Sequence, residues 1–300
     1  MISDGTTSKR TLHIGTYNVW LMHPLVTFFA HRVGIDISPR KMTRAKLIPE
    51  VLPENLDVLV LCEAFCARAT DELCRLLKER HGLVYRTHIL GSRSNICASG
   101  KLLSGGVVIV SKFPLDIIEE QAFGSICARD DSLADKGFLY VKFQTDDGLA
   151  VNIFATHTQA WDEPKCKIAR CGQIGKLREF IVEKDIPENE VVLIVGDLNV
   201  PREDKEYEDM LALLNSFNPN QTDLENPSFN HISNVLASKG PSSGGTSTTV
   251  DYILVSKEHV QPTEFFAEVL PLKANKSYDY KGRTLDDLSD HYPVFGKFVF

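Results

Sequence analysis

Short apolar runs recur along the chain at the length expected for β-strands. The clearest is Asp57–Cys62, whose sequence DVLVLC is almost continuously apolar, as in a strand buried on both faces. Several runs follow one another without an intervening helical pattern, which predicts antiparallel pairing. Seven further runs share this composition: Leu12–Val19, Gly105–Ser111, Gly137–Phe143, Leu149–Thr156, Val191–Val195, Val250–Val255 and Tyr292–Phe298.

Helical patterns separate other runs. In Ala69–Arg80 the leucines fall on one face, and Gly82 follows as a stop signal. Three more segments are predicted as helices: Lys41–Leu52, Lys165–Lys184 and Asp204–Leu214. The combined pattern predicts an α/β (α+β) fold. We expect a four-layer α/β/β/α sandwich, in which two mixed, mainly antiparallel sheets pack face to face beneath outer helices.

Long stretches without a regular pattern connect these elements. Loops of such length usually serve function or are mobile. They are Leu21–Pro39, Gly91–Leu103, Asn215–Thr249 and Pro271–Ser289. Because no repeat or linker divides the chain, we expect residues 1–300 to form a single domain, with residues 1–10 as a flexible N-terminus.

Composition narrows the class of partner. The 300 residues carry a formal net charge of -7, which makes nucleic acid an unlikely partner because nucleic-acid binding usually needs a basic surface. The seven cysteines contain no Cys-x-x-Cys pair, and we interpret them as free thiols of a reducing compartment. No signal peptide or transmembrane run is visible. We therefore expect a monomer located in the cytoplasm or peripherally on a membrane.

Polar residues stand where the predicted strands end. Asp197 and Asn199 follow the run VVLIV in Gly-Asp-Leu-Asn. Residues two apart at a strand end point the same way, so a carboxylate and an amide face one site. They could orient a water molecule and donate to an oxyanion. A plain Asx turn is the ordinary alternative.

Asn18 ends the first run, and Glu63 directly follows Asp57–Cys62. A carboxylate that ends a buried strand must reach water, pair with a cation or bind a metal. Carboxylate and amide oxygens without thiolates suit Mg²⁺, or Mn²⁺, better than Zn²⁺. Taken alone, each residue is also explained by a turn or an exposed strand end.

Further chemistry lies at other strand ends. His157 follows one run, Asp251 begins another, and Asp290 with His291 precedes the last in Ser-Asp-His-Tyr-Pro. Each has an ordinary explanation alone, such as an exposed histidine. Together, a histidine for proton transfer, carboxylates for a metal and donors for phosphate oxygens are what hydrolytic phosphoryl transfer needs.

Taken in order, these stretches resemble the endonuclease/exonuclease/phosphatase, or deoxyribonuclease-I-like, superfamily over nearly the whole chain. They are Thr16-Tyr-Asn18, Glu63, Gly196-Asp-Leu-Asn199, Asp251-Tyr-Ile and Ser289-Asp-His291. Three more stretches resemble the neutral and bacterial sphingomyelinases: Ser104–Pro114, Ala134–Tyr140 and Ala155–Ala160. The resemblance implies one catalytic domain with Mg²⁺-dependent phosphodiesterase activity, which cleaves sphingomyelin into ceramide and phosphocholine.

The resemblance also implies roles on the metal side of the site. Glu63 corresponds to the principal Mg²⁺ ligand. Asn18 would lie close to that metal or to the phosphate, and Asp290 would be a carboxylate on the same side. Asp197 would orient or deprotonate the attacking water.

Roles in proton transfer and phosphate binding follow in the same way. His291 resembles the general acid or base, held by Asp251 in a His–Asp pair. Asn199 and His157 look like donors to phosphate oxygens. Lys136, in the stretch Asp-Lys-Gly, could supply a point charge to the phosphate, or be an ordinary solvated lysine.

The chain departs from the bacterial sphingomyelinases in one stretch. Those enzymes carry an aromatic-tipped hairpin before the terminal Ser-Asp-His, whereas Pro271–Asp287 is polar, with Tyr278 and Tyr280 as its aromatic residues. We therefore expect weak, salt-sensitive peripheral contact with a phospholipid membrane through this loop. An apolar insertion element would lie instead in Leu21–Ala30. The alternatives for function are a nuclease, a phosphoinositide phosphatase, or an inactive binding homologue.

Overall fold

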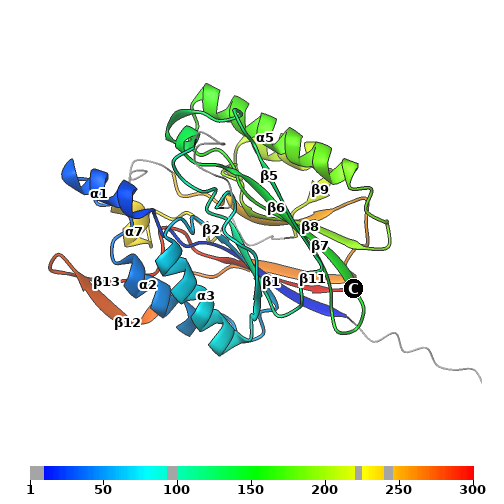
Figure 1. The fold of residues 1–300 in the computed structure, drawn as a ribbon, viewed down its shortest axis with the longest axis horizontal. Helices are drawn as coiled ribbons and strands as arrows, with labels where there is room; N and C mark the ends of the chain where they lie inside the picture. The colour runs from blue at the N-terminus through cyan, green and yellow to red at the C-terminus, as the bar shows by residue number, and fades with distance from the viewer. Residues whose placement is uncertain (1–9, 93–100, 220–224, 240–245) are drawn as a thin grey trace, which may run out of the picture.

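The computed structural model describes residues 10–92, 101–219, 225–239 and 246–300. Two six-stranded sheets pack face to face, with helices outside them (Figure 1). The first sheet has the order β11-β14-β1-β2-β4-β3, built from β1 (Thr11–Asn18), β2 (Val58–Cys62), β3 (Tyr85–Arg86), β4 (Val108–Ser111), β11 (Glu264–Val269) and β14 (Val294–Val299). The second has the order β5-β6-β7-β8-β10-β9, built from β5 (Ile117–Ala122), β6 (Gly137–Gln144), β7 (Ala150–His157), β8 (Val191–Asp197), β9 (Ser216–Phe217) and β10 (Asp251–Ser256).

Each sheet contains one parallel pair at its centre. Strand β1 pairs in parallel with β2, and β7 pairs in parallel with β8, while the other pairs within these two sheets, among the described strands, are antiparallel. A parallel pair needs a crossover, and helices supply it after β1 and after β7. The ends of parallel strands meet at one sheet edge, so Asn18 aligns with Cys62 and His157 with Asp197.

Helices complete four layers. On the first sheet lie α2 (Lys41–Leu47), which continues as η1 (Ile48–Glu50), and α3 (Ala67–His81); on the second lie α5 (Pro164–Glu183) and α6 (Lys205–Leu213). One apolar core fills the space between the sheets, and one fills the space beneath each helical layer. Helix α3 ends at Gly82, which takes the left-handed conformation at φ 69°. The predicted four-layer sandwich is confirmed.

Three of the stretches predicted to be irregular contain regular elements; in Asn215–Thr249 these are the short strand β9 and a short helix near residue 237. Leu21–Pro39 contains the helix α1 (Pro24–Arg32), whose first turn is favoured by Pro24 and capped by His23. The polar stretch before Ser289 forms a hairpin of β12 (Lys273–Tyr280) and β13 (Arg283–Asp287). Lys281 and Gly282, both at positive φ, make its two-residue turn. The apolar residues of α1 are exposed and the hairpin is mostly polar, so neither element has the buried apolar face by which the other elements were predicted.

Short elements make the remaining connections. They are η2 (Arg129–Leu133) and α7 (Val235–Lys239). The N-terminus that we predicted to be flexible falls almost entirely outside the described residues, as does most of Gly91–Leu103. In the part of the chain that is described, no helix has the length and apolar character to cross a bilayer.

Candidate active site

Polar side chains converge at one edge of the two sheets. Asn18 ends β1, and Glu63 directly follows β2. His157 and Asp197 end β7 and β8, and the antiparallel register sets Asp251 of β10 beside Asp197. The topology of both sheets therefore brings together residues that lie far apart in the sequence, such as Asn18 and Asp251, which are 233 positions apart.

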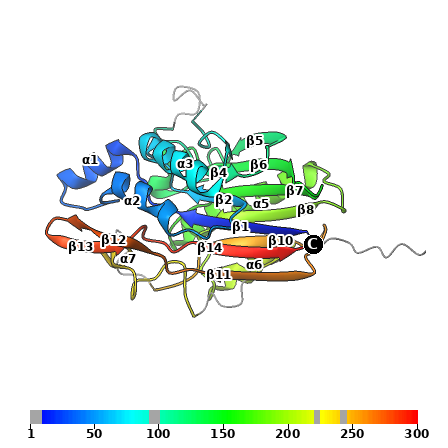
Figure 2. The same ribbon diagram turned by 90° about the horizontal axis from the view of Figure 1, so that it is seen from below.

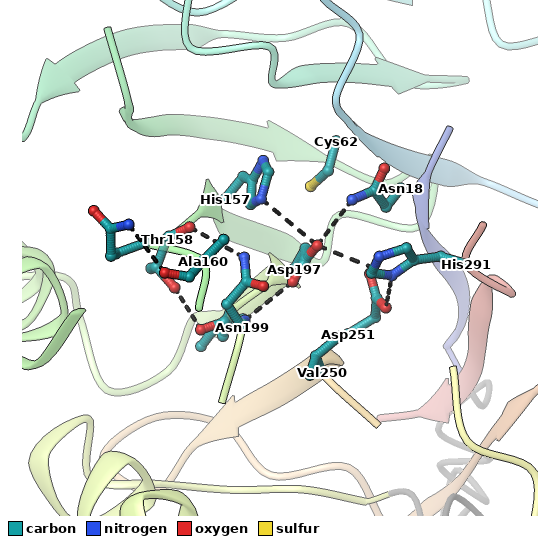
Figure 3. Close-up of polar contacts among 12 residues, drawn as sticks. Asn18, Cys62, His157, Thr158, Ala160, Asp197, Asn199, Val250, Asp251 and His291 are labelled. Atoms are coloured by element: carbon teal, nitrogen blue, oxygen red, sulfur yellow. Dashed lines mark hydrogen bonds and ion pairs between the residues drawn. The ribbon is translucent and has the colours of Figure 1, made fainter. Parts of the chain in front are cut away.

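Asp197 lies at the centre of this cluster (Figure 3). Its Oδ2 accepts a hydrogen bond from Asn18 Nδ2 at 2.9 Å and lies 3.6 Å from His157 Nε2 and 4.0 Å from His291 Nδ1. Its Oδ1 accepts from the backbone N–H of Asn199 at 3.0 Å. The structure thus unites five of the residues that the sequence indicated.

The Gly-Asp-Leu-Asn stretch owes its shape to close backbone packing. A Cβ on Gly196 would lie 1.9 Å from Thr156 O of β7, so only glycine allows this approach. Asn199 adopts a left-handed φ of 52° and donates from Nδ2 to Thr158 O at 3.1 Å. That bond uses one of its two amide protons and leaves the other for a ligand.

His291 and Asp251 form a His–Asp pair. Nδ1 of His291 donates to Asp251 Oδ2 at 2.8 Å, and Ser228 Oγ donates to the same oxygen at 2.7 Å. Burial would lower the pKa of His291, but the carboxylates of Asp251, Asp197 and Asp290 raise that pKa well above its usual value. A histidine held at Nδ1 by a carboxylate keeps its Nε2 free for proton transfer.

Lys136 is buried and bound within the protein. Its Nζ donates to Thr158 O at 2.7 Å and lies 2.9 Å from Asp131 Oδ2 and 3.3 Å from His157 Nε2. Burial, and then the charge of Lys136, lower the pKa of His157 to about 3. The imidazole is therefore neutral near pH 7. Lys136 thus contacts the imidazole of His157, and the sequence did not indicate this contact.

Glu63 has the features of an incomplete cation site. It takes a left-handed φ of 55°, and its inaccessible Oε2 has no hydrogen-bond partner among the described residues. Burial, followed by the negative charge of Asp290, raises the pKa of Glu63 to about 8. Two facing carboxylates that resist ionisation are what a bound divalent cation would stabilise. The residues at this position therefore fit a metal.

A second group of ligand atoms lies beside it. Single atoms of Asp197, Asp251 and His291 all lie within 4.8 Å of one another, and these three buried residues could hold a metal ion. The proton between His291 and Asp251 competes with that arrangement, because the nitrogen that would bind the metal already donates a hydrogen bond.

Arg44 is a residue that sequence reasoning missed. It lies on the buried face of α2 and is fully inaccessible. Its guanidinium ties the segment after Asn18 to the segment before Ser289, through the carbonyl oxygens of Val19, Trp20, Pro39 and Leu288 and the hydroxyl of Ser38. The sequence contained one indication of this role, which is that an arginine lies within the apolar face of a predicted helix. Ser228 and Asp131, which hold Asp251 and Lys136, gave none.

Comparisons with known proteins agree with this geometry. The model of the Endonuclease/Exonuclease/phosphatase family matches residues 15–291. Sphingomyelinase C 2 of Leptospira interrogans is 34% identical over 274 residues, which is 88% of this chain. The match spans 42% of that relative, so the chain corresponds to less than half of its length.

Solved structures are similar over nearly the whole chain. The crystal structure of SmcL has a TM-score of 0.83 at 30% identity and covers 96% of this chain and 99% of its own. A beta toxin variant from Staphylococcus aureus, with bound magnesium ions, has a TM-score of 0.80 at 28% identity, with 96% and 99% covered. The fold, the order of the motifs and these matches together show that the chain belongs to the endonuclease/exonuclease/phosphatase family, and within it to the sphingomyelinase-like branch.

Proposed function

We propose that this protein is a Mg²⁺-dependent phosphodiesterase that hydrolyses sphingomyelin to ceramide and phosphocholine. One observation carries the proposal: the His291–Asp251 pair and Asp197 converge beside Glu63, whose buried carboxylate oxygen lacks a partner among the described residues. The similarity to a protein named sphingomyelinase supports the choice of substrate.

Glu63, Asn18 and Asp290 would hold the metal. These oxygen donors suit Mg²⁺, and Mn²⁺ accepts the same ligands. Bound there, the ion would supply positive charge to phosphoryl oxygens as they gain negative charge. The magnesium ions bound in a similar beta toxin structure support this assignment.

The chain's own residues supply the proton transfers. Asp197 lies within 4.0 Å of both His157 Nε2 and His291 Nδ1, where it can orient the attacking water and accept its proton. The raised pKa of His291 keeps the ring protonated, so its Nε2 can deliver a proton to the leaving ceramide oxygen. Asp251 holds the ring in the required orientation.

The phosphate oxygens would be bound by Asn199, His157 and Lys136. Asn199 has one amide proton left for this purpose, and neutral His157 has one N–H to donate. Lys136 adds positive charge behind His157. We propose that the protein acts as a monomer that contacts the membrane peripherally to reach its lipid.

The test incubates pure protein with Mg²⁺ and, in parallel, sphingomyelin, phosphatidylcholine, abasic DNA or inositol phosphates. We expect the wild-type protein to release phosphocholine from sphingomyelin. The control variant Glu54→Gln, which makes the same substitution at an exposed glutamate, should do so as well. We expect none in EDTA or with Glu63→Gln. Faster cleavage of DNA or inositol phosphate, or full activity in EDTA, would overturn the proposal.

A further inference from the structure

We infer that α1 is the element by which this protein enters a lipid bilayer, in place of the hairpin β12–β13. The inference rests on the proposed function, because it assumes a substrate within a membrane. It assigns the membrane contact to the outer face of α1, which is defined by Leu25, Phe28 and Phe29 of the helix and by Val33, the residue that caps its C-terminus.

The outer face of α1 is apolar and open to solvent. Its four residues recur at intervals of three and four, so they form one stripe along the helix. Their side chains are 58%, 53%, 65% and 72% exposed. Of the nine described residues of α1, Ala30 alone is buried. A helix that turns its apolar stripe away from the protein body requires another partner, since exposed apolar patches of this kind mark interaction sites.

Polar contacts hold α1 in place without covering this stripe. Nζ of Lys41 donates to Met22 O at 2.8 Å and to Thr27 Oγ1 at 3.0 Å, which ties the segment before α1 and the end of its first turn to α2. A hollow of about 600 Å³ separates the rest of α1 from α2 and Tyr280, and Phe28 lines it at the edge of the stripe, with the Arg32 guanidinium 5.2 Å from its ring. Leu25, Phe29 and Val33 do not line this hollow, and all four residues of the stripe are exposed, so the stripe is available for a partner.

Charge around α1 favours a lipid surface as that partner. Between residues 21 and 47 the accessible Lys and Arg side chains number four and the Asp or Glu side chains number one, whereas the whole chain has a net charge of -7. They are Arg32, Arg40, Lys41 and Lys46 against Asp36. Basic residues beside an apolar helical face are typical of helices that lie in the bilayer interface.

Position relates α1 to the active site. The helix begins six residues after Asn18, and both it and the hairpin lie at the end of the sandwich opposite the C-terminus in each view (Figures 1 and 2). A bilayer that supplies lipid to the active site at the strand ends would therefore contact α1. A protein partner or a second copy would have to occupy the surface that the substrate membrane needs.

The hairpin is a poor alternative. Tyr278 is buried, and its hydroxyl donates to Asp287 O at 2.5 Å. Tyr280 Oη donates to Asp36 Oδ1 at 2.9 Å, and Lys281 Nζ approaches the same oxygen at 2.6 Å. Both tyrosines of the hairpin are thus used inside the protein, and Tyr280 with Lys281 braces the segment that follows α1.

The test measures co-sedimentation with vesicles of sphingomyelin and phosphatidylcholine, in EDTA so that no lipid is hydrolysed. The variant is Phe28→Ser/Phe29→Ser. The matched control is Ile168→Ser/Val182→Ser on α5, where the side chains are 73% and 58% exposed. We expect wild-type and control proteins to remain bound at roughly 1 M salt, where surface charge is screened, and the variant to bind at least about tenfold more weakly.

Activity on detergent-dispersed sphingomyelin should be equal in all three proteins. Vesicle binding that is unchanged in the variant, or lost by the wild type in high salt, would overturn the inference. The inference would also be overturned if the wild type formed a dimer in sedimentation, the variant did not, and the variant still bound vesicles. That result would assign the stripe to a second copy of the chain. If the wild-type protein hydrolyses no detergent-dispersed sphingomyelin in Mg²⁺ but its vesicle binding still depends on the two phenylalanines, the proposed function fails and the membrane contact through α1 stands.

Discussion

Replacing Arg44 by lysine tests whether one buried guanidinium holds the two sides of the active site together. Lysine keeps the charge but has three donor protons at one point, whereas arginine has five in a plane. In the structure all five are used: Nε donates to Pro39 O at 2.8 Å, Nη1 to Val19 O and Leu288 O at 2.9 Å, and Nη2 to Trp20 O and Ser38 Oγ at 2.8 Å. At least two buried acceptors must therefore lose their donor.

Trp20 O still accepts from Ser38 Oγ, and Ser38 Oγ from the N–H of Met22, so the cost falls on the other three acceptors. Each orphaned buried group costs about 1–3 kcal/mol, so the loss of two of these three would lower the free energy of unfolding of Arg44→Lys by about 2–6 kcal/mol. That is a large part of the roughly 5–15 kcal/mol typical of a folded protein. Urea unfolding would show a lower midpoint at an unchanged m-value. Val19 and Leu288 adjoin Asn18 and Ser289, so kcat should also fall, by about ten- to a hundredfold, through misplaced side chains.

Arg40→Lys is the matched control, because Arg40 is exposed and its Nε donates to Asp279 O at 2.9 Å. Its effect on stability should stay within about 0.5 kcal/mol. The reasoning would be refuted if Arg44→Lys unfolded at the wild-type urea concentration, or if both variants lost the same stability. If Arg44→Lys were less stable but had the same kcat as the wild type, only the effect of Arg44 on the position of the active-site residues would be refuted.

Three further predictions concern the active-site residues. Asp251→Asn and His291→Ala should each lower kcat for phosphocholine release by roughly two to four orders of magnitude, and additive losses in the double variant would contradict a functional pair. In EDTA the melting temperature should fall as pH rises from 4.5 towards 8, because Glu63 keeps its proton in the folded state to about pH 8 and loses it near 4.5 when unfolded. Mg²⁺ should restore stability more at pH 8 than at pH 5, and Glu63→Gln should remove this difference; a pH-independent gain would contradict the assignment. Lys136→Met should move the NMR titration of His157 upward, though still below its usual range because burial remains, and an unmoved midpoint would show that the lysine does not act on the ring.

The sequence by itself determined the inner strands of both sheets and the chemistry at their ends, whereas it did not indicate the edge strands β3, β5, β9 and β11. The run of Asp57–Cys62 and the run before Gly196 are apolar because the strands are buried on both faces, and that signal is local. The pairing of Asp197 with Asn199 is also local, but it rests on an Asx turn rather than on strand alternation, because β8 ends at Asp197 and the N–H of Asn199, at a left-handed φ of 52°, donates to Asp197 Oδ1. Such features need no knowledge of distant segments.

Tertiary structure decided how these pieces meet. Arg44 acts through acceptors as distant in sequence as Leu288, and Lys136 lowers the pKa of His157 because the sheet sets them side by side. Helix α1 presents its apolar stripe outward, so its pattern alone could not show which face was buried. Contacts between residues far apart depend on the register and crossover of the strands, and a sequence pattern of period two or 3.6 contains neither.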